Sequence, residues 1–261
     1  MEVKKHFVLV HGTCFGAWVW YKLASLLKSN GHKVTSIDMK SSRTNINPIV
    51  AEEVKSITDY SQPLFDLMAS LPLEERVILV GHSLGGISIS LAMEIFHQKI
   101  SVAVFLTAVM PGPHLTMELI NQVFEGQLGS YLDTKFIYGD GADKPPTSYI
   151  FGREFLSTVL YQESPPEDVE LACLLVRPIA ISVVEGSLGE NALTNENYGS
   201  VSRIYCITGK DKLSNVEIQK WLVEKNLPNE VKTFQNSDHM TMTSCPQELF
   251  TYLQDISQRY T

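Results

Sequence analysis

Short hydrophobic runs alternate with longer amphipathic segments along much of this 261-residue chain. The runs predict strands and the segments of helical period predict helices. In chain order these are strand 7–11, helix 18–29, strand 34–38, helix 60–70, strand 77–81, helix 84–96 and strand 102–108. Strands 77–81 and 102–108 are almost continuously apolar, as expected of parallel strands that helices cover on both faces. This alternation predicts an α/β domain with a mostly parallel sheet flanked by helices.

The alternation is interrupted in the second half of the chain and then resumes. It predicts strand 201–208, helix 215–225, strand 230–235 and helix 246–259. The intervening residues 112–199 contain prolines, glycines and helical patches without a regular order. One α/β domain of this length is common, so we treat residues 1–261 as a single domain. Residues 112–199 are then predicted to form a helical cap inserted over one end of the sheet.

A G-x-S-x-G motif at residues 81–85 lies between an apolar strand and a helix. That context is the one required for a nucleophile elbow, a sharp turn that holds a serine in a strained backbone conformation. Gly81 and Gly85 are small enough to avoid clashes in such a turn. The motif therefore predicts an α/β-hydrolase fold with Ser83 as nucleophile. The amide of Leu84, at the helix N-terminus, is predicted to stabilise a developing oxyanion.

A serine hydroxyl needs a base, and a carboxylate must orient that base. His239 follows the last predicted strand, so it is the strongest candidate among the seven histidines. Asp211 follows strand 201–208, which gives the chain order serine, aspartate, histidine. Asp238 adjoins His239 but is expected to face elsewhere. The alternatives, a surface-packed histidine and an ordinary charged turn, stay open at this point.

The loop after the first strand is expected to lie beside the elbow. The amide of Thr13 is predicted as the second oxyanion donor, with Gly12 letting the loop turn closely over the substrate carbonyl. Phe15, further along the loop, is a candidate for the pocket wall. His82 should point away from the nucleophile because side chains alternate along a strand. The predicted substrate-binding set is Gly12, Phe15, His82 and Met240.

Composition and charge indicate which binding partners and which cellular location to expect. A net charge of −8 with interspersed signs gives no reason to expect nucleic acid or a membrane as partner, so a small molecule is expected. The four cysteines form no C-x-x-C pair, which favours reduced thiols over a disulfide or metal site. The apolar stretch 7–10 is too short for a signal peptide or a membrane span, which indicates a cytoplasmic protein. A homodimer stays open.

Five stretches resemble the plant methylesterase and hydroxynitrile lyase family, and the similarity covers nearly the whole chain. These stretches are residues 6–18, 31–35, 77–86, 198–201 and 237–240. The resemblance implies an α/β-hydrolase core with a small helical cap and no metal or organic cofactor. The family's catalytic residues fall on Ser83, Asp211 and His239, and its oxyanion donors on the amides of Thr13 and Leu84.

The resemblance implies an ester hydrolase acting on small methyl esters. Family members cleave methyl esters of plant hormones, but Lys40 and Arg43 depart from the family pattern. A specialised-metabolite ester, such as an alkaloid or iridoid methyl ester, is therefore expected at least as strongly. Residues 110–113 and 224–241 also resemble methylketone synthase, a decarboxylase that lacks the serine nucleophile. Hydrolysis followed by spontaneous decarboxylation of a β-carbonyl acid is thus a further hypothesis.

Two other functions compete with ester hydrolysis. The family's S-selective hydroxynitrile lyases carry threonine after the first-strand histidine and lysine after the catalytic histidine. Here those places hold Gly12 and Met240, so the charge partner for cyanide is missing. A non-catalytic small-molecule receptor would also retain the triad, but such receptors resemble other branches of the superfamily more closely.

Overall fold

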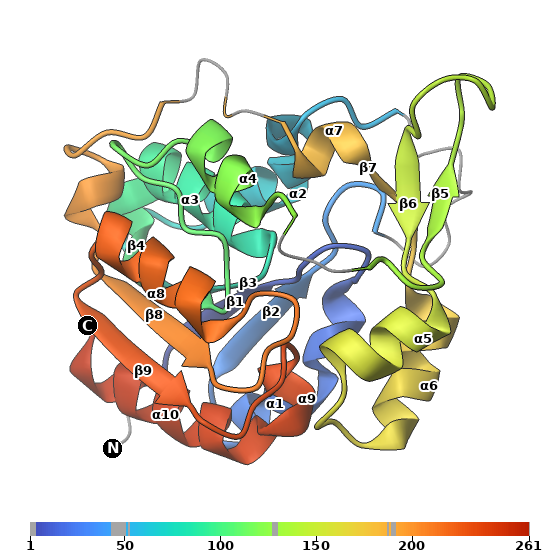
Figure 1. Ribbon diagram of the computed structural model, residues 1–261. Helices are drawn as coiled ribbons and strands as arrows, with labels where there is room; N and C mark the ends of the chain where they lie inside the picture. Colours follow the sequence, from blue (N-terminus) through green and yellow to red (C-terminus); the bar gives the residue numbers. More distant parts are fainter. Residues whose placement is uncertain are drawn as a thin grey trace.

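The structure is a computed structural model that describes residues 4–42, 51, 53–126, 130–186, 188 and 192–260 (Figure 1). Its elements are β1 His6–Val10, η1 Ala17–Trp20, α1 Tyr21–Ser29, β2 Lys33–Ile37, α2 Ile57–Ser70, β3 Val77–His82, α3 Gly85–Phe96, η3 His97–Lys99, β4 Ile100–Leu106, α4 Met117–Phe124, β5 Lys135–Ile137, β6 Ser148–Ile150, α5 Arg153–Phe155, η4 Leu156–Leu160, α6 Pro166–Leu175, β7 Ile179–Ala180, α7 Ile181–Val184, η5 Tyr198–Ser200, β8 Arg203–Thr208, α8 Val216–Lys225, β9 Glu230–Phe234, α9 Thr241–Ser244 and α10 Pro246–Arg259. The strands and helices predicted outside residues 112–199 are all present, with ends shifted by a few residues.

A six-stranded sheet in the order β2-β1-β3-β4-β8-β9 forms the centre of the molecule. Every neighbouring pair in it is parallel, which confirms the predicted sheet. The chain starts in β1, adds β2 on one side and then continues on the other side from β3 onward. The strand order therefore reverses between β1 and β3, where α/β proteins commonly bind ligands at the carboxyl ends of the strands.

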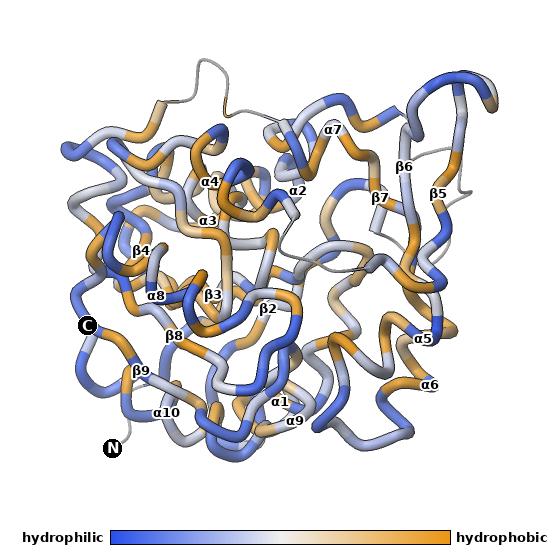
Figure 2. Tube along the Cα trace, in the orientation of Figure 1, coloured by the Kyte–Doolittle hydropathy of each residue, from blue (hydrophilic) through white to orange (hydrophobic). Residues whose placement is uncertain are grey.

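Helices cover both faces of this sheet (Figure 1). Helices α1 and α10 pack together on one face, and α2, α3 and α8 lie on the other. The inner strands β3 and β4 are fully buried along their length, and the most hydrophobic stretches run through the middle of the molecule (Figure 2). This rigid layer fixes the loops that leave the carboxyl ends of the strands. No helix in the described part of the chain has the length and apolarity needed to cross a bilayer.

The insertion between β4 and β8 lies over the carboxyl edge of the sheet and beside it (Figure 1). It contains α4 to α7, as expected of helical patches, but also a second sheet in the order β5-β6-β7. The predicted helical insertion thus also contains three short strands. These antiparallel strands have only two or three residues each, too few to show the alternation that identifies a strand in sequence.

Candidate active site

The turn between β3 and α3 has the strained geometry predicted for a nucleophile elbow. Ser83 has φ of 54°, in the left-handed region that side chains rarely adopt. Its carbonyl accepts hydrogen bonds from the amides of Gly86 and Val109, at 3.1 and 3.0 Å. A Cβ atom at Gly85 would lie 2.6 Å from the His11 carbonyl oxygen, so the loop after β1 can approach only a glycine here. Close backbone packing therefore holds the turn in place.

Asp211 and His239 form a buried pair at the same edge of the sheet. The distance between His239 Nδ1 and Asp211 Oδ2 is 2.7 Å. The other carboxylate oxygen accepts hydrogen bonds from the amides of Leu213 and Ser214, both at 2.9 Å. Burial alone would raise the pKa of the Asp211 carboxyl, but the adjacent imidazole and these hydrogen bonds lower this pKa below its ordinary value. The carboxylate is thus ionised and fixed toward the imidazole.

Thr107, which the sequence analysis missed, completes the surroundings of this carboxylate. Its hydroxyl donates to Asp211 Oδ2 at 2.6 Å, and Thr208 donates to the same oxygen at 3.1 Å. Thr107 has φ of 40°, so the chain turns sharply where β4 ends. The sequence does contain a signal for Thr107, since it is a polar residue directly after a continuously apolar strand. That strand ends at the same edge of the sheet as the strands before Ser83 and Asp211.

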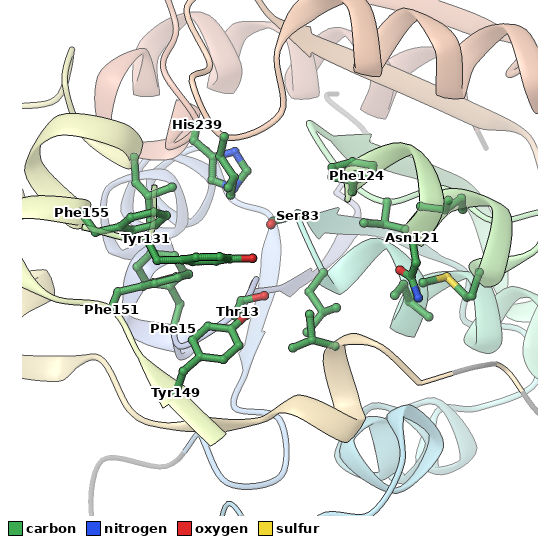
Figure 3. A pocket seen from close by; sticks show the side chains of 18 residues that line it. Thr13, Phe15, Ser83, Asn121, Phe124, Tyr131, Tyr149, Phe151, Phe155 and His239 are labelled. Atoms are coloured by element: carbon green, nitrogen blue, oxygen red, sulfur yellow. The ribbon is translucent and has the colours of Figure 1, made fainter. Parts of the chain in front are cut away.

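Two predicted oxyanion residues lie beside Ser83. Thr13 and Leu84 both line the cavity that contains Ser83 (Figure 3). Within the described residues, no hydrogen bond joins either amide to a protein acceptor. Leu84 directly precedes the first residue of α3, so its N–H points out of the helix end. Both amides are therefore available to a substrate oxygen.

His11 holds the loop that carries Thr13. Its Nδ1 lies 2.8 Å from the Gly12 carbonyl oxygen, and its Nε2 accepts the Met39 amide at 3.2 Å. Burial lowers the pKa of His11 to about 4, so the imidazole is neutral near pH 7. One ring nitrogen can then donate while the other accepts, and both hydrogen bonds are satisfied.

The cavity in front of Ser83 has a volume of about 200 Å³. Its lining consists of Thr13, Phe15, Ser83, Leu84, Ile87, Val109, Met117, Ile120, Asn121, Phe124, Tyr131, Tyr149, Phe151, Phe155, Leu160, Val184, Leu213 and His239. None of these is Asp, Glu, Lys or Arg, and the aromatic rings of Phe15, Tyr131, Tyr149, Phe151 and Phe155 gather on one side (Figure 3). The side chains of Ser83 and His239 face the same space (Figure 3). The cavity thus presents one nucleophile and one base to an uncharged, largely apolar molecule.

The four residues of the predicted substrate-binding set lie in different surroundings. Phe15 lines the cavity, whereas Gly12, His82 and Met240 are not among its lining residues, and a substrate contact of each stays a prediction. His82 is fully buried, and its Nε2 lies 2.9 Å from the His239 carbonyl oxygen. Met240 is also fully buried. These residues support the loops behind the site, a role that depends on tertiary packing and leaves no local signal in sequence.

Asp238 faces away from the imidazole of its neighbour, as expected. Its Oδ2 accepts hydrogen bonds from the Glu163 amide and the Ser164 hydroxyl, both at 2.9 Å. Its Oδ1 accepts the Met240 amide at 2.8 Å. Asp238 therefore ties the loop of His239 to the inserted segment.

Of the two unusual cations after β2, Lys40 is not among the residues that line the cavity. Lys40 pairs with Asp59 at 2.6 Å, and Arg43 lies outside the described residues. Across the described residues, no three histidine, cysteine, aspartate or glutamate side chains are grouped to hold a metal ion.

Comparison with known proteins shows the family to which the chain belongs. A family model described as the alpha/beta hydrolase family matches residues 7–251. The chain is 46% identical to methyl jasmonate esterase 1 of Vitis vinifera over 98% of both proteins. It is 43% identical to polyneuridine aldehyde esterase of Rauvolfia serpentina, over 97% of this chain and 96% of that one. A crystal structure of tomato methylketone synthase I complexed with 2-tridecanone superposes with a TM-score of 0.92, at 43% identity over 99% of this chain and 100% of that one.

Proposed function

The chain belongs to the α/β-hydrolase family and is a serine esterase, and from that premise we propose that Ser83, His239 and Asp211 hydrolyse small carboxylic methyl esters. The observation that carries the assignment is the buried Asp211–His239 hydrogen bond beside a strained serine at one cavity. Ser83, Asp211 and His239 follow three different strands, β3, β8 and β9, and yet lie together. If Asp211 belonged only to an ordinary charged turn, there would be no reason for this arrangement.

The reaction follows from the positions of these groups. The Ser83 hydroxyl attacks the ester carbonyl carbon while His239 takes its proton, and Asp211 stabilises the resulting imidazolium. The amides of Thr13 and Leu84 donate to the carbonyl oxygen as it becomes negative. His239 then gives the proton to the leaving alkoxide, which departs as methanol. A water molecule, deprotonated by the same imidazole, releases the acid and restores Ser83.

Ester hydrolysis is favoured over cyanohydrin cleavage by the residues around the nucleophile. A Cβ atom at Gly12 would lie 2.7 Å from Ser83 Cβ, so this backbone has no room for a side chain there. Met240 is buried and uncharged, and no lysine lines the cavity. A leaving cyanide would therefore meet no lysine in this cavity.

The relatives and the cavity together support the substrate class. The named relatives are esterases of methyl jasmonate and of polyneuridine aldehyde, and the apolar cavity of this chain suits the body of such an ester. We place the protein in plant specialised metabolism on the same grounds. The insertion, residues 112–199, is proposed as the cap that selects among esters, because it supplies most of the cavity wall. A cytoplasmic location and a homodimer stay predictions.

A second candidate outcome is suggested by the methylketone synthase structure. If the substrate carries a carbonyl two carbons from the ester carbon, hydrolysis yields a β-carbonyl acid. That acid loses carbon dioxide through a cyclic proton transfer without a further catalytic residue. Wild type fed the free acid should then release carbon dioxide no faster than buffer does. A much faster release would show that the protein itself catalyses the decarboxylation.

The esterase assignment is tested with a panel of methyl esters, including methyl jasmonate and alkaloid methyl esters, and mass spectrometry of the acid products. We expect Ser83→Ala to fold normally and to lose several orders of magnitude in turnover. Intact-protein mass spectrometry should detect an acyl adduct on wild type with slow substrates and none on the variant. Near-wild-type hydrolysis by the folded variant would overturn the assignment of Ser83.

A further inference from the structure

A few polar side chains interrupt the apolar wall of the catalytic cavity. Those whose side chains readily form hydrogen bonds are Thr13, Ser83, Asn121, Tyr131, Tyr149 and His239. Ser83 and His239 belong to the proposed reaction, and the side chains of Thr13 and Tyr149 are hydrogen-bonded to each other. The hydroxyl of Tyr131 can rotate to donate or to accept. Among these six, only Asn121 has an oxygen that can do nothing but accept.

The nitrogen of the Asn121 side chain is bound to the protein. Asn121 lies in α4, and its Nδ2 donates to the Glu185 carbonyl oxygen at 3.1 Å. Glu185 directly follows α7, so this carbonyl is one that the helix itself does not pair. Because only the amide nitrogen can donate to a carbonyl, this hydrogen bond fixes the orientation of the whole amide.

The oxygen of the same amide points the other way. Figure 3 shows it on the side of Asn121 that faces Ser83, across the cavity from the rings of Tyr131 and Phe151. Within the described part of the chain, no donor forms a hydrogen bond to this oxygen. The cavity therefore contains an acceptor that has a fixed direction and no protein partner.

A bound substrate decides whether this oxygen is satisfied. Before binding, water can donate to it, and the substrate displaces that water. An apolar group placed against the oxygen leaves it without a donor, which costs free energy. An O–H or N–H group in the same place restores the hydrogen bond. Sites built to bind such a group reject the analogue that lacks it.

We infer that Asn121 determines specificity and that the natural substrate is an ester with an O–H or N–H donor, which binds Asn121 Oδ1 while the ester carbonyl lies at Ser83. This inference rests on the proposed ester hydrolysis. The donor lies apart from the ester group, because Thr13 and Leu84 surround the carbonyl and Asn121 lies on the opposite wall from the aromatic rings. An ester with an ether or ketone oxygen at that place would bring two acceptors together and is disfavoured.

The test uses matched pairs of methyl arylpropanoates. In one set the phenyl ring carries a hydroxyl or a methyl group at the ortho, meta or para position. In a further pair an indole N–H is compared with its N-methyl analogue. For wild type we expect at least one donor ester to exceed its methylated partner in kcat/KM by about 10-fold. The pair that shows this preference tells whether O–H or N–H is recognised, and equal kcat/KM within every pair would overturn the inference.

The decisive variant is Asn121→Leu, because leucine has nearly the same shape but no acceptor. We expect it to lose the preference for the donor ester and to hydrolyse the methylated partner at least as well as wild type does. Gln122→Leu is the matched control. It makes the same kind of change at the next residue of α4, which is exposed and is not among the cavity-lining residues, so it should keep the wild-type preference.

A purely structural role of Asn121 gives a different result. If this residue only ties α4 to α7, Asn121→Leu slows all esters equally and keeps the preference, and the inference is wrong. Thermal unfolding checks that the variant is folded, and Asn121→Ala provides the same comparison if it is not. If wild type and Ser83→Ala hydrolyse the methylated partners equally, the proposed function itself fails.

Discussion

The carboxyl edge of the sheet and the insertion face each other across one cavity but are held by different interactions. At the edge, strained turns at Ser83 and Thr107 are fixed by short hydrogen bonds and close backbone packing. Across the cavity, the insertion contributes aromatic side chains that pack in a continuous cluster, with the rings of Phe151 and Phe155 stacked at 4.8 Å. Tyr131, at the end of this cluster, is about half exposed.

This difference indicates that the sheet edge carries out the reaction and that the insertion selects the ester. Changing the edge should weaken the reaction with every ester, because each group there acts on the reacting atoms or on their supports. Changing the insertion should alter the order of preferred esters, because its side chains contact the remote part of the substrate.

The largest effect is expected for Asp211→Asn. Without the carboxylate, the imidazolium formed in the reaction is no longer stabilised and the tautomer of His239 is no longer fixed, so kcat should fall by about 10⁴-fold for all esters. Asp238→Asn is the matched control, because that carboxylate adjoins His239 but faces the insertion. Steady-state kinetics with two dissimilar esters would measure both variants. A loss in Asp238→Asn as great as that in Asp211→Asn would refute the assignment.

Gly12→Ala should come next. The added Cβ would lie 2.7 Å from Ser83 Cβ and 3.0 Å from His82 Nδ1, so the elbow or the loop must shift. A displacement of this kind can cost about 100-fold in kcat/KM. Gly199→Ala, where the nearest atom is 3.6 Å away, should behave like wild type. Full activity of Gly12→Ala would mean that the oxyanion loop tolerates displacement.

The buried neutral His11 should make stability depend on pH. Its folded pKa of about 4 lies below the ordinary histidine value of 6.5, so the unfolded chain binds the proton more readily as the pH falls. The neutral imidazole therefore contributes fully to the free energy of unfolding above pH 6.5, and this contribution is lost as the pH falls toward 4. The loss between pH 8 and pH 5 amounts to about 2 kcal/mol. Urea unfolding at both pH values should show this loss in wild type and a loss smaller by that amount in His11→Asn. Equal losses would show that His11 is not the group responsible.

Thr107→Val is expected to reduce kcat by about 10-fold, since it removes one hydrogen bond to a charged group. The same hydrogen bond helps to lower the pKa of Asp211, so this pKa should rise in the valine variant. Thr107→Ser keeps the hydroxyl and should retain most of the activity. If serine and valine variants lose activity equally, the threonine acts through packing alone.

The same division explains what the sequence could predict. The six strands and their helices follow from hydrophobic period, and Ser83 follows from a motif whose glycines are needed for close packing. The strands β5 to β7 are too short for any period to appear, and Thr107 has no motif of its own. Whether His82 reaches a substrate is decided by residues far away in the chain, which bury it completely. Local signals therefore identify the edge better than the insertion.

The smallest effect on rate, and the largest on preference, is expected from exchanging residues 112–199 for those of polyneuridine aldehyde esterase. The Asp238 contacts to Glu163 and Ser164 and the Asp168 contact to Tyr21 join the insertion to the rest of the chain, so the exchange should keep those residues. With the edge untouched, kcat for the best ester of each protein should differ by less than about 10-fold, while the order of kcat/KM across the methyl-ester panel should move toward that of the donor. A matched exchange of α10, which lines no part of the cavity, should leave the order as it was. If the cap exchange also leaves the order unchanged, selection lies with the edge and the division drawn between the two regions is wrong.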